Sequence, residues 1–149
     1  MKPDDPSIDK AETLYWRAPE LPLANWTVFD EGRNGERVRG GAFAWNDDGV
    51  SCYIDSILRT VGLDHLAVKD IPRNGVLSVE AGNVRECKLG VARDPDPDYI
   101  AKDRLRPRDK AHALIVHSDD VGSKQRGKRT SALAKTAQIV HWGDDPPAK

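Results

Sequence analysis

Apolar and polar positions form their clearest pattern in the last third of the chain. Residues 113–116 read Ala-Leu-Ile-Val, a run that is too short for a buried helix and typical of a strand buried on both faces. A polar loop at 118–122 and a cationic segment at 124–129 follow it. Apolar positions at helical spacing come next: Leu133, Ala134 and Ala137. Because 139–142 is again β-rich, the pattern predicts a central strand, a cationic loop, a helix and a further strand.

Shorter β-rich runs occupy the rest of the chain. They predict strands at 13–16, 26–29, 37–45, 76–79 and 91–93. The pair Asn34-Gly35 readily takes positive φ, so it predicts a hairpin turn before the third of these strands. A short helix is expected at about 82–88, between the last two strands.

The segment from 50 to 61 has two interpretations. Its apolar residues fall at helical spacing, and Gly62 stands where a C-terminal cap belongs, which predicts one helix. Residues 50–54 can equally form a strand that leads into a shorter helix at Asp55. Both interpretations remain open at this point.

These elements predict a single α+β domain at 12–142. We expect a mixed twisted sheet of about six short strands, with two longer helices packed on one face. The strand–helix–strand units at 76–93 and 113–142 are expected to supply its parallel or mixed part.

Three segments are predicted to lie outside the core. Residues 1–11 and 143–149 contain prolines and charges without an apolar period, which is typical of disordered tails. Residues 94–110 form a long charged segment with three prolines, and we expect a peripheral loop there.

Composition adds limits on the protein class. The 149 residues suit one domain, and 38% hydrophobic with 32% charged residues implies a modest core. Cys52 and Cys87 form no C-x-x-C pair, and the N-terminus lacks an export signal, so a reducing, cytoplasmic location is expected. No apolar stretch approaches the roughly 18–20 residues that cross a bilayer, so no membrane partner is expected.

The formal net charge of −1 hides an uneven distribution. Residues 1–98 hold 12 Lys and Arg against 18 Asp and Glu, whereas residues 99–142 hold 10 against 4. A local cationic region attracts anions even on a neutral protein. The alternative is that the two parts neutralise each other within one fold.

The cationic segment is the first candidate site. Gly122 and Gly127-Lys128 have the spacing of a phosphate-cradling P-loop, but Arg129 stands where that motif needs Ser or Thr. A phosphate cradle without a metal or cofactor is one interpretation, and a solvated basic helix start is the other. We expect the regular helix to begin near Thr130, which leaves the cations in a loop. The candidate anion-binding residues are Lys124, Arg126, Lys128, Arg129 and Thr130.

His112 is the candidate catalytic residue. It precedes the predicted central strand and could meet Asp94 or Asp96 across neighbouring strand ends, forming a general base with an orienting carboxylate. A structural histidine is the alternative. The four histidines show no zinc-type spacing, so no metal site is expected. The four tryptophans could stack on bases, although a core role is more typical in a small domain.

Several short motifs are similar to those of a group of small uncharacterised bacterial proteins. They are Arg-Gly-Gly-Ala-Phe at 39–43, Val-Ser at 50–51, Val-Glu-Ala-Gly-Asn-Val-Arg at 79–85, Arg-Asp-Pro-Asp-Pro at 93–97 and Ala-His-Ala at 111–113. This chain departs from the group in its glycine pair, in Lys110 at a proline position and in a longer stretch after Pro97. The resemblance implies no activity. It marks four positions for testing: Arg39, Arg93, Asp94 and His112.

Two classes of function follow from these patterns. The first is a non-enzymatic binding or adaptor module that holds a nucleotide, a nucleic-acid backbone or an acidic protein partner through 124–130. The second is a small enzyme acting on a nucleotide or nucleic acid with His112 and Asp94 as an acid–base pair. The sequence contains no recognisable nucleophile, metal cluster or complete phosphate motif, which favours the first class.

Overall fold

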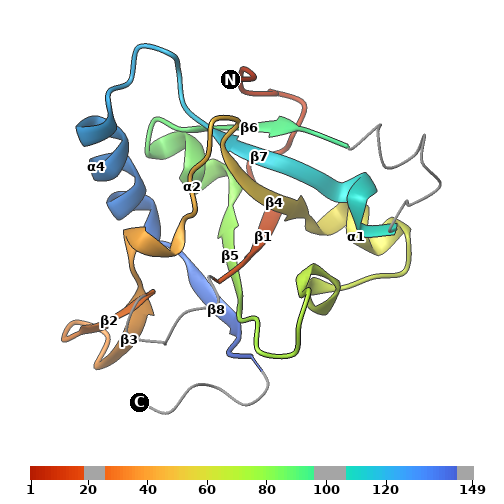
Figure 1. Cartoon of the computed structure of the whole chain (residues 1–149), viewed down its shortest axis with the longest axis horizontal. Coiled ribbons are helices and arrows are strands. Elements are labelled where there is room, and N and C mark those ends of the chain that lie inside the picture. Colours follow the sequence, from red (N-terminus) through yellow and green to blue (C-terminus); the bar gives the residue numbers. More distant parts are fainter. Residues whose placement is uncertain (19–25, 96–106, 144–149) are drawn as a thin grey trace.

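An antiparallel sheet forms the centre of the computed structural model, which describes residues 1–18, 26–95 and 107–143 (Figure 1). Within these residues the sheet has six strands in the order β6-β7-β4-β1-β5-β8. The strands are β1 (Thr13–Arg17), β4 (Val50–Ile54), β5 (Val76–Glu80), β6 (Gly90–Arg93), β7 (His112–Val116) and β8 (Gln138–His141).

A separate hairpin and several helices surround this sheet. The hairpin pairs β2 (Thr27–Asp30) with β3 (Gly35–Val38), and Asn34 takes positive φ in its turn. The α-helices are α1 (Asp55–Thr60), α2 (Ala81–Glu86) and α4 (Ser123–Ala134). Among the described residues three 3-10 turns accompany them: η2 (Gly40–Ala42), η3 (His65–Val68) and η4 (Pro107–Ala111).

The larger core lies on the sheet face covered by α2 and α4. Alternate strand residues point to this face, as the pleat of a strand requires. They include Leu14, Trp16, Cys52, Leu77 and Ile115, all buried. Val84 of α2 and Leu133 of α4 belong to the same cluster.

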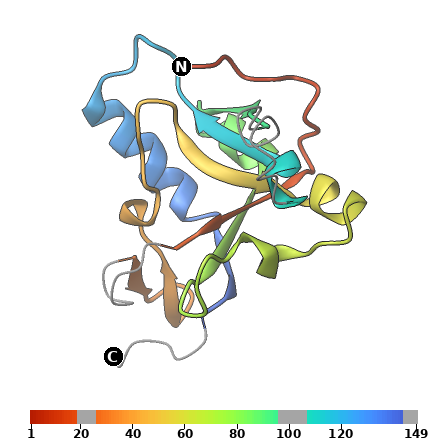
Figure 2. The same cartoon turned by 45° about the vertical axis from the view of Figure 1, so that its right-hand side comes forward.

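The opposite sheet face carries a smaller core beneath α1, η3 and η4. Tyr53 and Val76 of the sheet meet Leu58 of α1, Val68 of η3 and Ala111 of η4 there. Figure 2 shows α4 on one side of the sheet, with α1 and η4 on the other. The arrangement therefore differs from the expectation that the longer helices share one face.

The α+β class and the six short strands in one small domain are confirmed, whereas the expected parallel or mixed part of the sheet is wrong. Every strand pairing is antiparallel. The strands of each strand–helix–strand unit, β5 with β6 and β7 with β8, run in the same direction, but three other strands lie between them. Hydrophobic periodicity identifies a strand without specifying its neighbours in the sheet. The pattern therefore could not show that the two strands of each unit lie apart.

The segment from 50 to 61 follows the second of its two interpretations. Residues 50–54 form β4, and the helix begins at Asp55. Strand β4 is buried on both faces, so its apolar residues lack the alternation that would distinguish a strand from a helix.

Residues 1–11 belong to the fold and are not a detached tail. The Asp5 N–H donates to the Val91 carbonyl at 2.7 Å, and the Val91 N–H donates to Asp4 Oδ1 at 2.8 Å. Ile8 is buried in the larger core. This segment therefore covers the free edge of β6, which would otherwise expose unpaired backbone groups.

The other two segments expected outside the core fall largely beyond the described residues. Residues 96–106 and 144–149 are not among them. The end of the 94–110 segment is packed, because Pro107–Ala111 forms η4 and Arg108 within it is 5% exposed. The expectation of a wholly peripheral loop is therefore wrong for this part.

Gly49 allows the chain to turn into β4 beside β7. Its φ is +130°, and a Cβ at this position would lie 2.4 Å from the Ile115 carbonyl oxygen. Both the positive φ and the close backbone approach require glycine. Gly127, in the interior of α4, differs on both counts, because nothing lies within 4 Å of a Cβ built there.

Two Gly→Ala substitutions are therefore expected to have opposite effects. Gly49→Ala should lower the free energy of unfolding by about 2 kcal/mol or more through backbone strain and contact with β7. Gly127→Ala should raise it by about 0.5–1 kcal/mol, because alanine favours a helix interior. Urea denaturation measures both. A destabilised Gly127→Ala variant would contradict an open helical environment at that position.

Candidate functional site

Helix α4 begins seven residues earlier than the sequence pattern predicts. Its first residue is Ser123, with Gly122 as the N-cap, and the Arg126 N–H donates to the Gly122 carbonyl at 2.9 Å. The expected start near Thr130 is therefore wrong. The helix brings like charges close at i,i+3 (Arg126 and Arg129) and at i,i+4 (Lys124 and Lys128), which costs only a few tenths of a kcal/mol per pair. Burial of Leu133 and Ala134 of the same helix in the larger core offsets this cost.

Thr130 is an interior residue of α4 and not its cap. It is 4% exposed, and its hydroxyl donates to the Arg126 carbonyl at 2.7 Å. The same Oγ1 accepts the Trp45 indole N–H at 3.0 Å. Thr130 therefore fixes the chain after η2 to the buried side of α4.

Arg126 lies against the ring that Thr130 holds. Its guanidinium carbon is 5.4 Å from the centroid of Trp45, within the range of a cation–π interaction. The Trp45 ring also lies 5.3 Å from the ring of His117. The guanidinium group of Arg126 is thus held against the Trp45 ring at the surface of α4.

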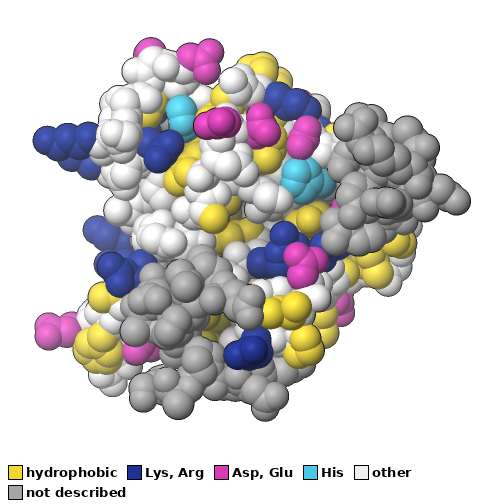
Figure 3. All heavy atoms as spheres, in the orientation of Figure 1, with side chains coloured by type: hydrophobic (Ala, Val, Ile, Leu, Met, Phe, Trp, Pro, Cys, Tyr) yellow, Lys and Arg dark blue, Asp and Glu magenta, His cyan; other side chains and the backbone are white. Residues whose placement is uncertain are grey.

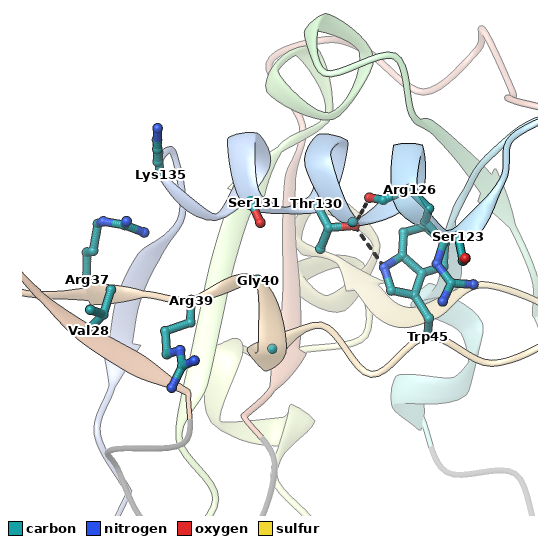
Figure 4. Close-up of a pocket in the computed structure, with 12 residues that line it drawn as sticks. Val28, Arg37, Arg39, Gly40, Trp45, Ser123, Arg126, Thr130, Ser131 and Lys135 are labelled. Atoms are coloured by element: carbon teal, nitrogen blue, oxygen red, sulfur yellow. Dashed lines mark hydrogen bonds between the residues drawn. The ribbon is translucent and has the colours of Figure 1, made fainter.

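A groove runs between β3, η2 and α4, and we call it the hairpin groove (Figure 4). Its volume is about 690 Å³. Four cationic side chains line it: Arg37, Arg39, Arg126 and Lys135. Figure 3 shows Lys and Arg side chains along the left-hand edge of the molecule, in the region of α4 and the hairpin.

Gly40 lets η2 approach α4 closely at the floor of the hairpin groove. A Cβ on Gly40 would lie 3.1 Å from Ser131 Oγ. In Figure 4 the Ser131 hydroxyl points from α4 toward η2. The groove thus combines hydroxyl groups with cations from two separate elements.

Only some of the residues predicted to bind an anion line the hairpin groove. Arg126 and Thr130 of the predicted anion-binding residues line it. Arg39, one of the four positions that the resemblance marked for testing, lines it as well. Lys124, Lys128 and Arg129 are not among its lining residues, and Arg129 donates to the Lys88 carbonyl at 2.9 Å. The sequence pattern missed Arg37, Lys135 and Trp45. The two-residue spacing of Arg37 and Arg39 after a hairpin turn was the available signal.

Charge in the hairpin groove is partly balanced at one end. Arg37 Nε lies 3.1 Å from Asp30 Oδ2 across the β2–β3 hairpin. Among the described lining residues no side chain carries a carboxylate. The described lining residues therefore carry an excess of positive charge.

The opposite sheet face brings His112 and Asp94 together. Asp94 directly follows β6, and its N–H continues the β6–β7 ladder by donating to the His112 carbonyl at 3.0 Å. His112 Nδ1 lies 2.7 Å from the Asp94 carbonyl oxygen and 3.2 Å from Asp94 Oδ2. Lys2 Nζ contacts Asp94 Oδ1 at 2.7 Å. Asp96, the alternative partner, lies outside the described residues.

The other nitrogen of His112 meets a residue that the sequence pattern missed. Nε2 lies 2.6 Å from the Ser51 hydroxyl oxygen on β4. The β4–β7 register pairs Ser51 with Leu114 and Tyr53 with His112, so Ser51 and His112 are diagonal neighbours on one face. This proximity depends on a strand register that no local motif in the sequence reveals.

The remaining candidates have structural contacts. Arg93 donates to the Lys110 carbonyl at 3.0 Å and so joins β6 to η4.

Burial without a charged partner raises the pKa of the Cys52 thiol to about 12. Burial is also the main cause of the raised pKa of Cys87, with the Glu86 carboxylate adding to it. Both thiols are therefore protonated at neutral pH.

The described residues contain neither a membrane-spanning helix nor a cluster of metal-binding side chains. No helix among them is long and apolar enough to cross a membrane. Within the same residues, no group of three or more His, Cys, Asp or Glu side chains could hold a metal ion.

Comparisons with models of protein families, with curated proteins and with solved structures found no match to this chain. The resemblance of the motifs between 39 and 113 to small bacterial proteins thus stays a prediction.

The Trp45–Thr130 hydrogen bond is expected to contribute measurably to stability. Trp45→Phe removes the indole donor and Thr130→Val removes the acceptor, and each should lower the free energy of unfolding by about 1 kcal/mol. The double variant should lose clearly less than the two separate losses combined, because both remove the same bond. Urea denaturation of all four proteins measures this coupling, and strictly additive losses would contradict it.

Proposed function

We propose that the protein binds a phosphate-bearing ligand in the hairpin groove, as a binding module. The observation that carries the proposal is the convergence of Arg37 and Arg39 from the hairpin segment with Arg126 and Lys135 from the α4 region on one groove. Cations from separate parts of the chain line a common surface at the cost of mutual repulsion. An anionic ligand offsets that repulsion.

The chemistry of the groove supports phosphate as the recognised group. Three of its four cations are arginines, whose planar guanidinium can donate two parallel hydrogen bonds to phosphate oxygens. The Trp45 ring restrains Arg126, so less side-chain freedom is lost when a ligand binds. Ser123 and Ser131 add hydroxyl donors to the same lining.

The shape of the groove supports an extended polyanion over an enclosed small molecule. The hairpin groove is open along the surface between β3 and α4, and its cations are spread over both walls (Figure 4). A nucleic-acid backbone repeats its charge along its length and can contact both walls at once. We therefore favour an oligonucleotide, with a mononucleotide and an acidic protein as the competing ligands.

Charge reversal inside the groove should weaken oligonucleotide binding. The test uses a fluorescent twelve-residue oligothymidine, titrated by anisotropy at several salt concentrations. Arg39→Glu with Arg126→Glu should lower the affinity at least tenfold. The slope of log affinity against log salt should also become shallower by about 1.4, since about 0.7 is lost for each phosphate contact removed on a single strand.

A matched control separates the groove from net charge. Lys124→Glu with Lys128→Glu makes the same charge change on α4 residues that do not line the groove, and it should have a much smaller effect. Equal losses from the two double variants would contradict the groove as the site. Binding of ATP without oligothymidine would identify a mononucleotide site, and failure of the parent to bind either would overturn the proposal.

A further inference from the structure

We infer that Ser51 is the nucleophile of an acyl-transfer site that it forms with His112 and Asp94. This site lies on the sheet face opposite α4, apart from the hairpin groove, so it is a second function independent of phosphate binding. Three neighbouring strands supply it: Ser51 comes from β4, His112 from β7, and Asp94 directly follows β6.

The hydrogen bonds assign the protons of this group. The Asp94 carbonyl oxygen can only accept, so His112 Nδ1, 2.7 Å away, carries the ring proton. Nε2 is then the unprotonated nitrogen and accepts the Ser51 hydroxyl proton across 2.6 Å. This is the tautomer that a general base needs in order to activate a serine.

The imidazole is held in this orientation from several sides. The Asp94 carboxylate lies 3.2 Å from Nδ1 and is itself paired with Lys2. The ring of Tyr53 meets the ring of His112 edge-on at 5.4 Å. Asp94 therefore acts as a positioning residue that stabilises the imidazolium formed during reaction.

Ser51 faces a cavity of about 370 Å³. Asn46 and Asn74 also line this cavity, and the Oδ1 of each accepts backbone N–H groups. These bonds occupy the amide oxygens, which leaves the side-chain N–H₂ groups as donors. Amide donors stabilise the oxyanion of a tetrahedral intermediate when they are aimed at it.

The proposed substrate is a carboxylic ester with a small acyl group. Ser51 Oγ bonds to the carbonyl carbon while its proton passes to His112 Nε2. The ester C–O bond then breaks, and the alcohol leaves with the proton from Nε2. Water hydrolyses the acyl-serine by the same route: its proton passes to Nε2, the acid is released, and Ser51 recovers the proton. The cavity is lined by polar side chains, Arg17, Asn46, Asp70 and Asn74, with Arg17 paired to Asp70, and its volume limits the acyl group to a small one.

The first experiment labels the purified full chain with phenylmethylsulfonyl fluoride. Ser51 Oγ bonds to sulfur, the S–F bond breaks with loss of fluoride, and His112 takes the hydroxyl proton. Intact mass and peptide mapping should show one adduct, on Ser51. His112→Gln should slow labelling at least tenfold, and Ser51→Ala should abolish it. Ser56→Ala is the control, because the Ser56 hydroxyl donates to Glu12 at 2.9 Å and should not affect labelling.

A second variant tests the base without depending on Ser51→Ala. Ser51→Cys places a thiol beside His112, and iodoacetamide should alkylate it at neutral pH with loss of iodide. In the Ser51→Cys/His112→Gln variant the alkylation rate should fall at least tenfold. The raised pKa values of Cys52 and Cys87 keep their background reaction slow.

The outcomes are distinct from those of oligonucleotide binding. No adduct on Ser51 in the parent, or equal alkylation with and without His112, overturns the nucleophile assignment.

A kinetic test addresses the role of Asp94. The Asp94→Asn variant should hydrolyse p-nitrophenyl acetate with a kcat about tenfold lower and an unchanged KM. An unchanged kcat would remove Asp94 from the site.

Discussion

The register between β4 and β7 is the constraint on which the rest of the structure depends. It pairs Val50 with Ile115 and Tyr53 with His112, and it places apolar side chains of both strands in the larger core. A shift by one residue would move these apolar side chains to the other face, so burial strongly favours the observed register. The same register sets Ser51 beside His112. The polar group on one face is thus positioned by apolar packing on the other.

Helix α4 links this sheet to the hairpin through its buried side. Leu133 packs in the larger core. Thr130 accepts a hydrogen bond from the indole N–H of Trp45, a residue that shortly precedes β4. The helix therefore cannot shift along its axis without breaking a partly buried hydrogen bond and opening the core. This fixes the separation between Arg126 and the cations of the hairpin segment. Core packing and the Trp45–Thr130 hydrogen bond together therefore help to set the shape of the hairpin groove.

Local patterns in the sequence were enough to identify most elements but not their neighbours. The hairpin at Asn34-Gly35 and the buried strand at 113–116 follow from turn chemistry and apolar content, both of which are local. The antiparallel order of the sheet depends on pairing between distant segments, and no local pattern records it. The same limit applies to the sites: His112 and Asp94 could be paired from their positions at strand ends, whereas Ser51 could not. The loop expected at 124–129 was wrong because core burial of Leu133 and Ala134 stabilises the helix by more than like-charge repulsion at its start destabilises it.

Part of the uneven charge along the chain is neutralised within the fold. Arg108 belongs to the cationic part, and its guanidinium pairs with Asp70 of the acidic part. It also donates to the carbonyls of Ala67, Val68 and Lys69 at 3.0–3.1 Å, which ties η4 to η3. A buried guanidinium with four acceptors cannot be removed without leaving those acceptors unpaired, so this charge is internal to the fold. The four cations that line the hairpin groove are instead the ones for which we propose an anionic ligand.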